Sequence, residues 1–121
     1  MTRPFMLFAS LLVISLGTRA SAAPLCKPVL TVRDVGFSSM INLKRIWTAT
    51  VHVDASRCAG STGGLFALAF IRLAENAPDL EFSEPFIWHG SQAKVRVEFW
   101  ADEAVHDYWI AEVAPCACRG D

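Results

Sequence analysis

The chain has 121 residues, of which 53% are hydrophobic and 19% are charged, and its formal net charge at pH 7 is −1. This length allows one domain and excludes the large doubly wound and barrel enzyme folds. The near balance of 11 Lys and Arg against 12 Asp and Glu argues against a basic nucleic-acid binder, and the high apolar content argues against a disordered chain.

Residues 1–22 have the pattern of a secretory signal peptide. Arg3 supplies a positive start, residues 5–16 form an uncharged apolar run, and residues 20–22 are the small residues that precede a cleavage site. The apolar run is shorter than the roughly 20 residues that a membrane-spanning helix needs. We therefore predict cleavage after Ala22 and export to the periplasm or the medium. Residues 23–121 are then a single domain without a membrane segment.

The first two predicted elements of this domain are strands. Residues 47–55 alternate strictly, with every odd position apolar and every even position polar. A period of two gives a strand one dry face and one wet face. Residues 29–37 alternate less cleanly and are predicted as the strand before it.

Residues 64–73 are ambiguous, because both alternating sets of side chains are apolar. Their Ala and Leu content favours a helix. Their short length, the preceding Gly63 and Gly64 and their strand neighbours favour a central strand buried on both sides. We predict the strand.

Three more strands complete the pattern, at residues 80–88, 93–99 and 105–114. Pro85 interrupts the first of these and indicates an edge strand or a bulge. Loops are predicted at residues 38–43, 56–63, 75–78 and 90–92. Six to seven short strands with regular turns are typical of an all-β antiparallel sandwich.

The domain keeps four cysteines: Cys26, Cys58, Cys116 and Cys118. An even number in a small exported protein predicts two disulfides rather than a metal site. A bond within the Cys-x-Cys pair would be strained. Two connectivities remain open, 26–116 with 58–118 and 26–118 with 58–116. If each strand reverses the direction of the last, all four thiols gather at one end of the sandwich.

Two polar constellations were weighed as catalytic or metal sites. His52, Asp54 and Ser56 share one strand face, but successive Cα atoms on that face are about 6.7 Å apart, which places Ser56 too far from His52 for a triad. Asp102, Glu103 and His106, with Asp107, become neighbours if residues 102–107 form a helical turn, and they could then hold a cation or serve a small hydrolase. No cofactor motif is recognisable.

Two large apolar residues share their side of a strand with polar neighbours. Trp100 has the same parity as Lys94 and Arg96, and Ile87 has the same parity as Ser83. Exposed large apolar groups mark contacts with partners. We therefore predict Trp100 and Ile87 as a partner surface for a protein or carbohydrate of the cell envelope or medium.

The segments 47–58 and 99–105, with the Cys-x-Cys tail, resemble a family of small exported bacterial proteins to which no function is attached. The architecture resembles immunoglobulin and fibronectin type III sandwiches. Asp102, Glu103 and Ala104 followed by Tyr108 resemble the turn before a tyrosine corner, with the Tyr two residues later than in that motif. The resemblance implies kinship and fold only.

The sequence thus predicts an exported, disulfide-stabilised, non-catalytic binding or interaction module. One alternative is a metal-dependent protein or hydrolase that uses Asp102, Glu103 and His106. A second alternative is an exported enzyme inhibitor that presents the 56–63 loop.

Overall fold

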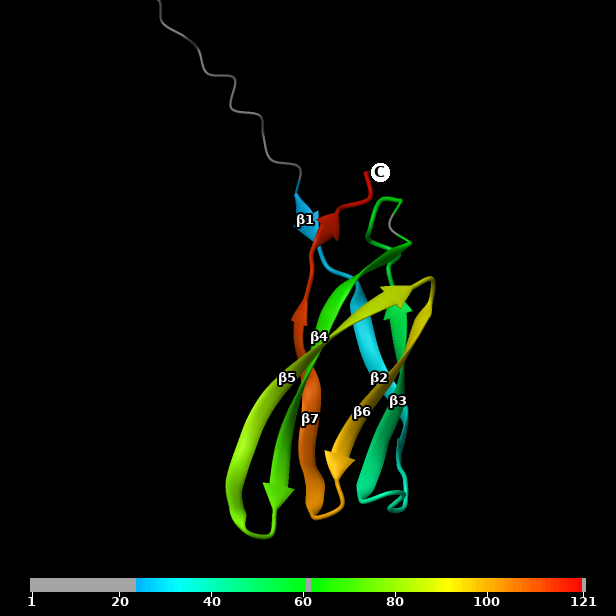
Figure 1. Cartoon of the computed structure of the whole chain (residues 1–121). Helices are drawn as coiled ribbons and strands as arrows, with labels where there is room; N and C mark the ends of the chain where they lie inside the picture. The colour runs from blue at the N-terminus through cyan, green and yellow to red at the C-terminus, as the bar shows by residue number, and fades with distance from the viewer. Residues whose placement is uncertain (1–23, 61, 121) are drawn as a thin grey trace, which may run out of the picture.

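The computed structural model describes residues 24–60 and 62–120, and this part of the chain is all β (Figure 1). The predicted signal peptide at residues 1–22 lies outside the described residues. Eight strands are present: β1 (Leu25–Cys26), β2 (Val29–Phe37), β3 (Lys44–Asp54), β4 (Gly63–Ala74), β5 (Ala77–His89), β6 (Gln92–Trp100), β7 (Glu103–Val113) and β8 (Cys116–Ala117).

The six long strands form a sandwich of two three-stranded layers. The hydrogen-bonded order is β2-β3-β6-β5-β4-β7, but β5 and β6 pair only at His89 and Gln92, beside the turn that joins them. Strands β2, β3 and β6 therefore make one layer, and β5, β4 and β7 make the other (Figure 1). All pairs are antiparallel, and β1 and β8 form a separate two-stranded ribbon. The predicted antiparallel sandwich is confirmed.

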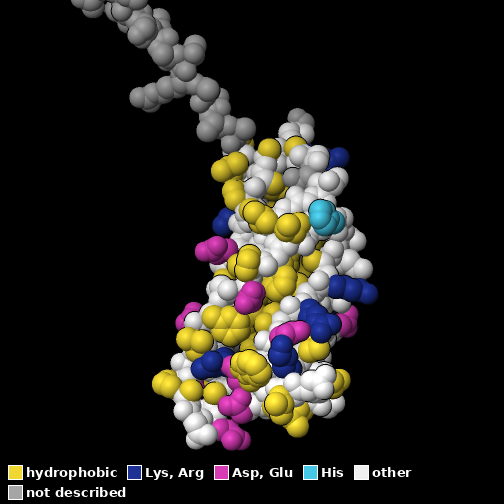
Figure 2. All heavy atoms as spheres, viewed as in Figure 1, with side chains coloured by type: hydrophobic (Ala, Val, Ile, Leu, Met, Phe, Trp, Pro, Cys, Tyr) yellow, Lys and Arg dark blue, Asp and Glu magenta, His cyan; other side chains and the backbone are white. Residues whose placement is uncertain are grey.

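The alternation of apolar residues places the core between the two layers. In β6 the buried residues are Ala93, Val95, Val97 and Phe99, and every residue between them is exposed. Aromatic rings fill the centre, where Trp47 of β3 contacts Phe70 of β4 at 4.9 Å between ring centroids. In Figure 2 a band of apolar side chains runs between the strands of the two layers. Burial of these side chains is the main favourable term in folding.

Residues 64–73 are a strand, as predicted, and β4 is the central strand of its layer. Antiparallel neighbours satisfy its backbone on both sides, which outweighs the helical preference of Ala and Leu. Burial on both faces is confirmed for residues 66–70 and not for Leu65, which is 57% exposed.

Other boundaries differ by a few residues. The predicted 75–78 loop is a tight turn at residues 75–76, because β5 begins at Ala77. Pro85 is tolerated because β5 there pairs with β4 alone, which confirms the predicted edge position. The helical turn considered for residues 102–107 is wrong, since β7 begins at Glu103 and continues in extended conformation.

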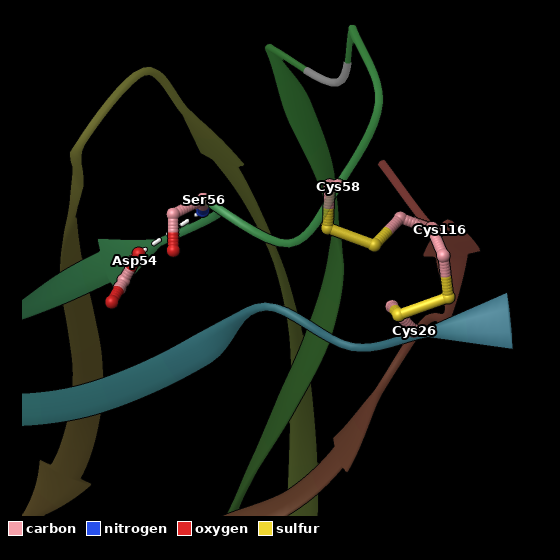
Figure 3. The surroundings of a disulfide bond; sticks show 6 residues. Cys26, Asp54, Ser56, Cys58 and Cys116 are labelled. Carbon is pink, nitrogen blue, oxygen red and sulfur yellow. Dashed lines mark hydrogen bonds between the residues drawn. A yellow bond between two sulfur atoms is a disulfide. The ribbon is translucent and has the colours of Figure 1, made fainter. Parts of the chain in front are cut away.

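The four cysteines gather at one end of the sandwich, and this prediction is confirmed. The bonds are Cys26–Cys118 and Cys58–Cys116, and they lie next to each other (Figure 3). Cys116 and Cys118 share a strand side because one residue separates them. Neither disulfide joins two cysteines that are backbone neighbours across the strands. In the strand pairing, Cys26 lies opposite Cys116 and Cys58 lies opposite Cys118. Both bonds join the β2–β3 side of the molecule to the end of β7.

Candidate interaction surface

The outer face of the β5–β4–β7 layer is built around β4. Phe66, Leu68 and Phe70 of this strand are buried in the core. Because successive side chains of a strand point to opposite faces, the residues between them point outward. The outward set is apolar throughout: Leu65, Ala67, Ala69, Ile71 and Leu73.

The neighbouring strands extend this apolar face. Ile87 lies opposite Leu65, and Pro85 lies opposite Ala67. Trp109 of β7 lies opposite Ala69 on the other side. Residues directly opposite in an antiparallel pair share a face of the sheet. Leu65 and Ile87 are 57% and 58% exposed, so this end of the apolar outer face is open to solvent, whereas Ala67 and Ala69 are buried.

A β-bulge shapes a groove on this face. The register of β4 and β7 shifts between Ala67 and Leu68, which leaves Ala111 as the extra residue. A bulge bends its strand and disrupts the ladder locally. The groove there has a volume of about 630 Å³, and its lining includes Leu65, Pro85, Ala111, Lys27 and Glu112. The outward apolar side chains of β4, with Ile87, Pro85, Trp109 and the groove at Ala111, together form what we call the β4 face.

The outer face of the β2–β3–β6 layer is polar. On this face, Thr50 of β3 lies opposite Lys94 of β6, and Thr48 lies opposite Arg96. Arg33 of β2 lies opposite Thr50 and adds a third cation. The two layers therefore share one core and present outer faces of opposite character.

The two residues predicted as a partner surface lie on different layers. Ile87 lies near the end of β5, on the β4 face. Trp100 is the last residue of β6, opposite Lys44, whose Nζ lies 5.6 Å from the centre of its ring. Both side chains are exposed, at 58% and 59%, but the structure does not bring them together.

Sequence reasoning missed the other members of the β4 face: Leu65, Pro85, Trp109 and Ala111. The signal was present in residues 64–73, where both alternating sets are apolar. In a two-layer fold only one of those sets can face the core. The other set therefore lies on the outer side of its layer.

Asp102, Glu103 and His106 do not converge. Glu103 is buried; its Oε1 accepts the backbone N–H of Trp100 at 2.6 Å, and its Oε2 pairs with Arg72 Nε at 3.1 Å. Asp102 lies in the β6–β7 turn, and His106 is exposed on β7. One oxygen of this buried carboxylate thus holds the end of β6, and the other ties the turn to β4. Within residues 24–60 and 62–120, no three His, Cys, Asp or Glu side chains gather into a metal-binding group.

Asp54 and Ser56 make an Asx-type turn at the end of β3, and His52 takes no part in it. The backbone N–H of Ser56 donates to Asp54 Oδ1 at 3.0 Å (Figure 3). This bond and one from the Ser56 hydroxyl hold the pKa of Asp54 below its ordinary value, with the hydroxyl as the larger cause. His52 lies two residues earlier in the ladder, opposite Thr31. The Asp–Ser contact terminates the strand.

The 56–63 loop, the site of the inhibitor alternative, is anchored at its base. Cys58 bonds to Cys116, and the backbone N–H of Ala59 donates to the Ala117 carbonyl at 2.8 Å. The backbone N–H of Arg119 donates to the backbone carbonyl of Arg57 at 2.7 Å. Ser61 lies outside the described residues.

No protein-family model, curated protein or solved structure matches this chain. Kinship with the small exported bacterial proteins therefore stays a prediction. Across the residues that the structure describes, no helix is long and apolar enough to cross a membrane.

Proposed function

We propose that this protein is an exported, non-catalytic interaction module that binds a partner protein through the β4 face. The observation that carries the proposal is the exposed Leu65–Ile87 pair beside the groove at Ala111. Contiguous exposed apolar surface in a small domain is typical of an interaction site. The exposed Leu65–Ile87 pair offers no hydrogen bonds to sugar hydroxyls, which favours a protein over a carbohydrate at this pair.

The export half of the proposal is supported by the disulfides. Two disulfides, with no free cysteine among the described residues, indicate an oxidising compartment outside the cytoplasm. The leader pattern of residues 1–22 points to the same destination.

The strand order supports an immunoglobulin-like assignment within the sandwich class. Lettered in chain order, β2, β3 and β6 correspond to strands A, B and E of that fold, and β4 and β7 to C and F. Strand β5 beside β4 takes the place of C′ in variable-type domains. Such sandwiches commonly serve as interaction modules, and function itself is argued here from the β4 face.

Photo-crosslinking in the producing cells tests the proposal. A photoreactive residue placed at Leu65 or Ile87 is expected to give one discrete protein adduct. The same residue at Thr48, on the outer face of the other layer, is expected to give none. Adducts from Thr48 and none from the β4 face would refute the proposal.

A further inference from the structure

Acidic side chains border the β4 face. Glu81 and Asp107 lie opposite Ile71 on its two sides, and Glu112 lies opposite Ala67. All three are exposed and, by the register, point to the same side as the apolar side chains. In Figure 2 acidic side chains lie mainly over β4, β5 and β7, and basic ones mainly over β3 and β6.

Among the described residues, no cation forms an ion pair with these three carboxylates. Within the described residues the ion pairs are Lys44–Glu98, Arg96–Glu98 and Arg72–Glu103. Asp107 accepts only the neighbouring backbone N–H of Tyr108, at 2.8 Å. Among the described residues that line the groove, Lys27 is the one cation, and Glu112 is also present.

The charges decide which occupant fits the apolar surface. A second copy that presented the same face would bring like charges together, which costs binding free energy. An anionic membrane surface is repelled in the same way. A segment with apolar side chains flanked by Lys or Arg matches both the apolar surface and the border.

We infer that the partner of the β4 face is a basic amphipathic protein segment, in which apolar residues are flanked by Lys and Arg. This inference rests on the proposed function and names the chemistry of its ligand. The apolar contacts supply most of the affinity, and the carboxylates supply orientation and a salt-dependent association rate.

The test uses the oxidised protein and a displayed library of random peptides about twelve residues long. Enriched peptides are expected to combine apolar residues with an excess of Lys and Arg. Leu65→Ser and Ile87→Ser are expected to weaken their binding about tenfold or more. Glu81→Gln with Glu112→Gln is expected to weaken it about two- to fivefold, with a smaller loss between about 0.05 and 0.3 M salt than wild type shows.

Matched substitutions on the other layer serve as controls. Trp100→Ser and Glu98→Gln change a similarly exposed apolar residue and a similarly exposed acid, and they are expected to leave peptide binding unchanged. All substituted side chains are solvent-exposed, so the variants are expected to melt near the wild-type temperature.

The outcomes separate the inference from the proposed function. Peptides that need Leu65 and Ile87 but carry no excess of Lys and Arg would overturn the inference and leave the interaction module standing. A library that yields no peptide dependent on these two residues would overturn both. Binding to phosphatidylcholine vesicles, or dimerisation lost with Leu65→Ser, would replace the basic segment with a membrane or a second copy.

Discussion

The two layers of the sandwich differ in where their strands place apolar side chains. In the β2–β3–β6 layer, strict alternation sends Val95 and Val97 into the core and Lys94 and Arg96 into water. In the β5–β4–β7 layer, both sides of β4 are apolar, and Leu65 remains exposed on the outside. Ahead of Trp100, the apolar side chains of β6 therefore all lie in the core. In β4, apolar side chains also lie on the outer side.

This difference separates folding from function. Burial of the inward side chains is enough to hold the two layers together. On the outer side of β4, Ala67 and Ala69 are buried and contribute to folding, whereas the exposed Leu65 contributes little. Exposed apolar surface favours aggregation, and the proposed function gives the exposed Leu65–Ile87 pair a role.

The largest effect is expected from removing the disulfide that links the two layers. Cys58 follows β3 and Cys116 follows β7, so their bond joins one layer to the other. Replacing both residues with Ser is expected to lower the free energy of unfolding by about 4 kcal/mol, since the closed loop restricts the unfolded chain. Equilibrium urea unfolding measures this. A loss below about 1 kcal/mol would contradict the stapling role.

Two leucines of β4 test the inner and outer faces directly. Leu68 is fully buried and Leu65 is 57% exposed. Leu68→Ala is expected to lower the free energy of unfolding by about 3 kcal/mol, because it leaves a cavity in the core. Leu65→Ala is expected to cost less than about 1 kcal/mol. Equal losses in urea unfolding would mean that the outer face also stabilises the fold.

A comparison of two glutamates tests the β6–β7 turn. Glu103 is buried against Arg72, whereas Glu98 pairs with Lys44 in the open. Glu103→Ala is expected to lower the free energy of unfolding by roughly 2–3 kcal/mol, because it leaves a half-buried guanidinium and a backbone N–H unpaired. Glu98→Ala is expected to change it by about 0.5 kcal/mol or less. Thermal unfolding of both variants measures these losses. A larger loss for Glu98→Ala than for Glu103→Ala would contradict the structure of the turn.

The smallest effect concerns Asp54 at the end of β3. Its pKa in the folded protein lies below 3.8, so its contribution to stability is present above about pH 4 and is lost as pH falls through the folded pKa. Ser56→Ala removes the larger cause of the shift and is expected to raise the pKa of Asp54 toward 3.8. NMR titration of the carboxyl carbon measures this. An unchanged pKa would show that the backbone bond alone is responsible.

Much of the fold followed from local pattern. Alternation in residues 47–55 and 93–99 predicted β3 and β6 because strand side chains alternate between core and water whatever their partners are. Asp102, Glu103 and His106, the alternative set that depended on a helical turn, stay apart because extended backbone separates residues that such a turn would join. Ile87 was placed on an exposed face correctly, but parity within one strand does not say which other strand shares that face.

The sequence by itself determined the strands, the antiparallel sandwich and the clustering of four thiols at one end, since these follow from period, turn spacing and strand reversal. Only the tertiary structure decided that Cys26 bonds to Cys118, because the choice depends on how β1 and β8 meet in space. It also decided that Leu65, Ile87 and Trp109 share one face while Trp100 lies on the other layer. Residues distant in sequence become neighbours only through the register of strands that pair across the sheet.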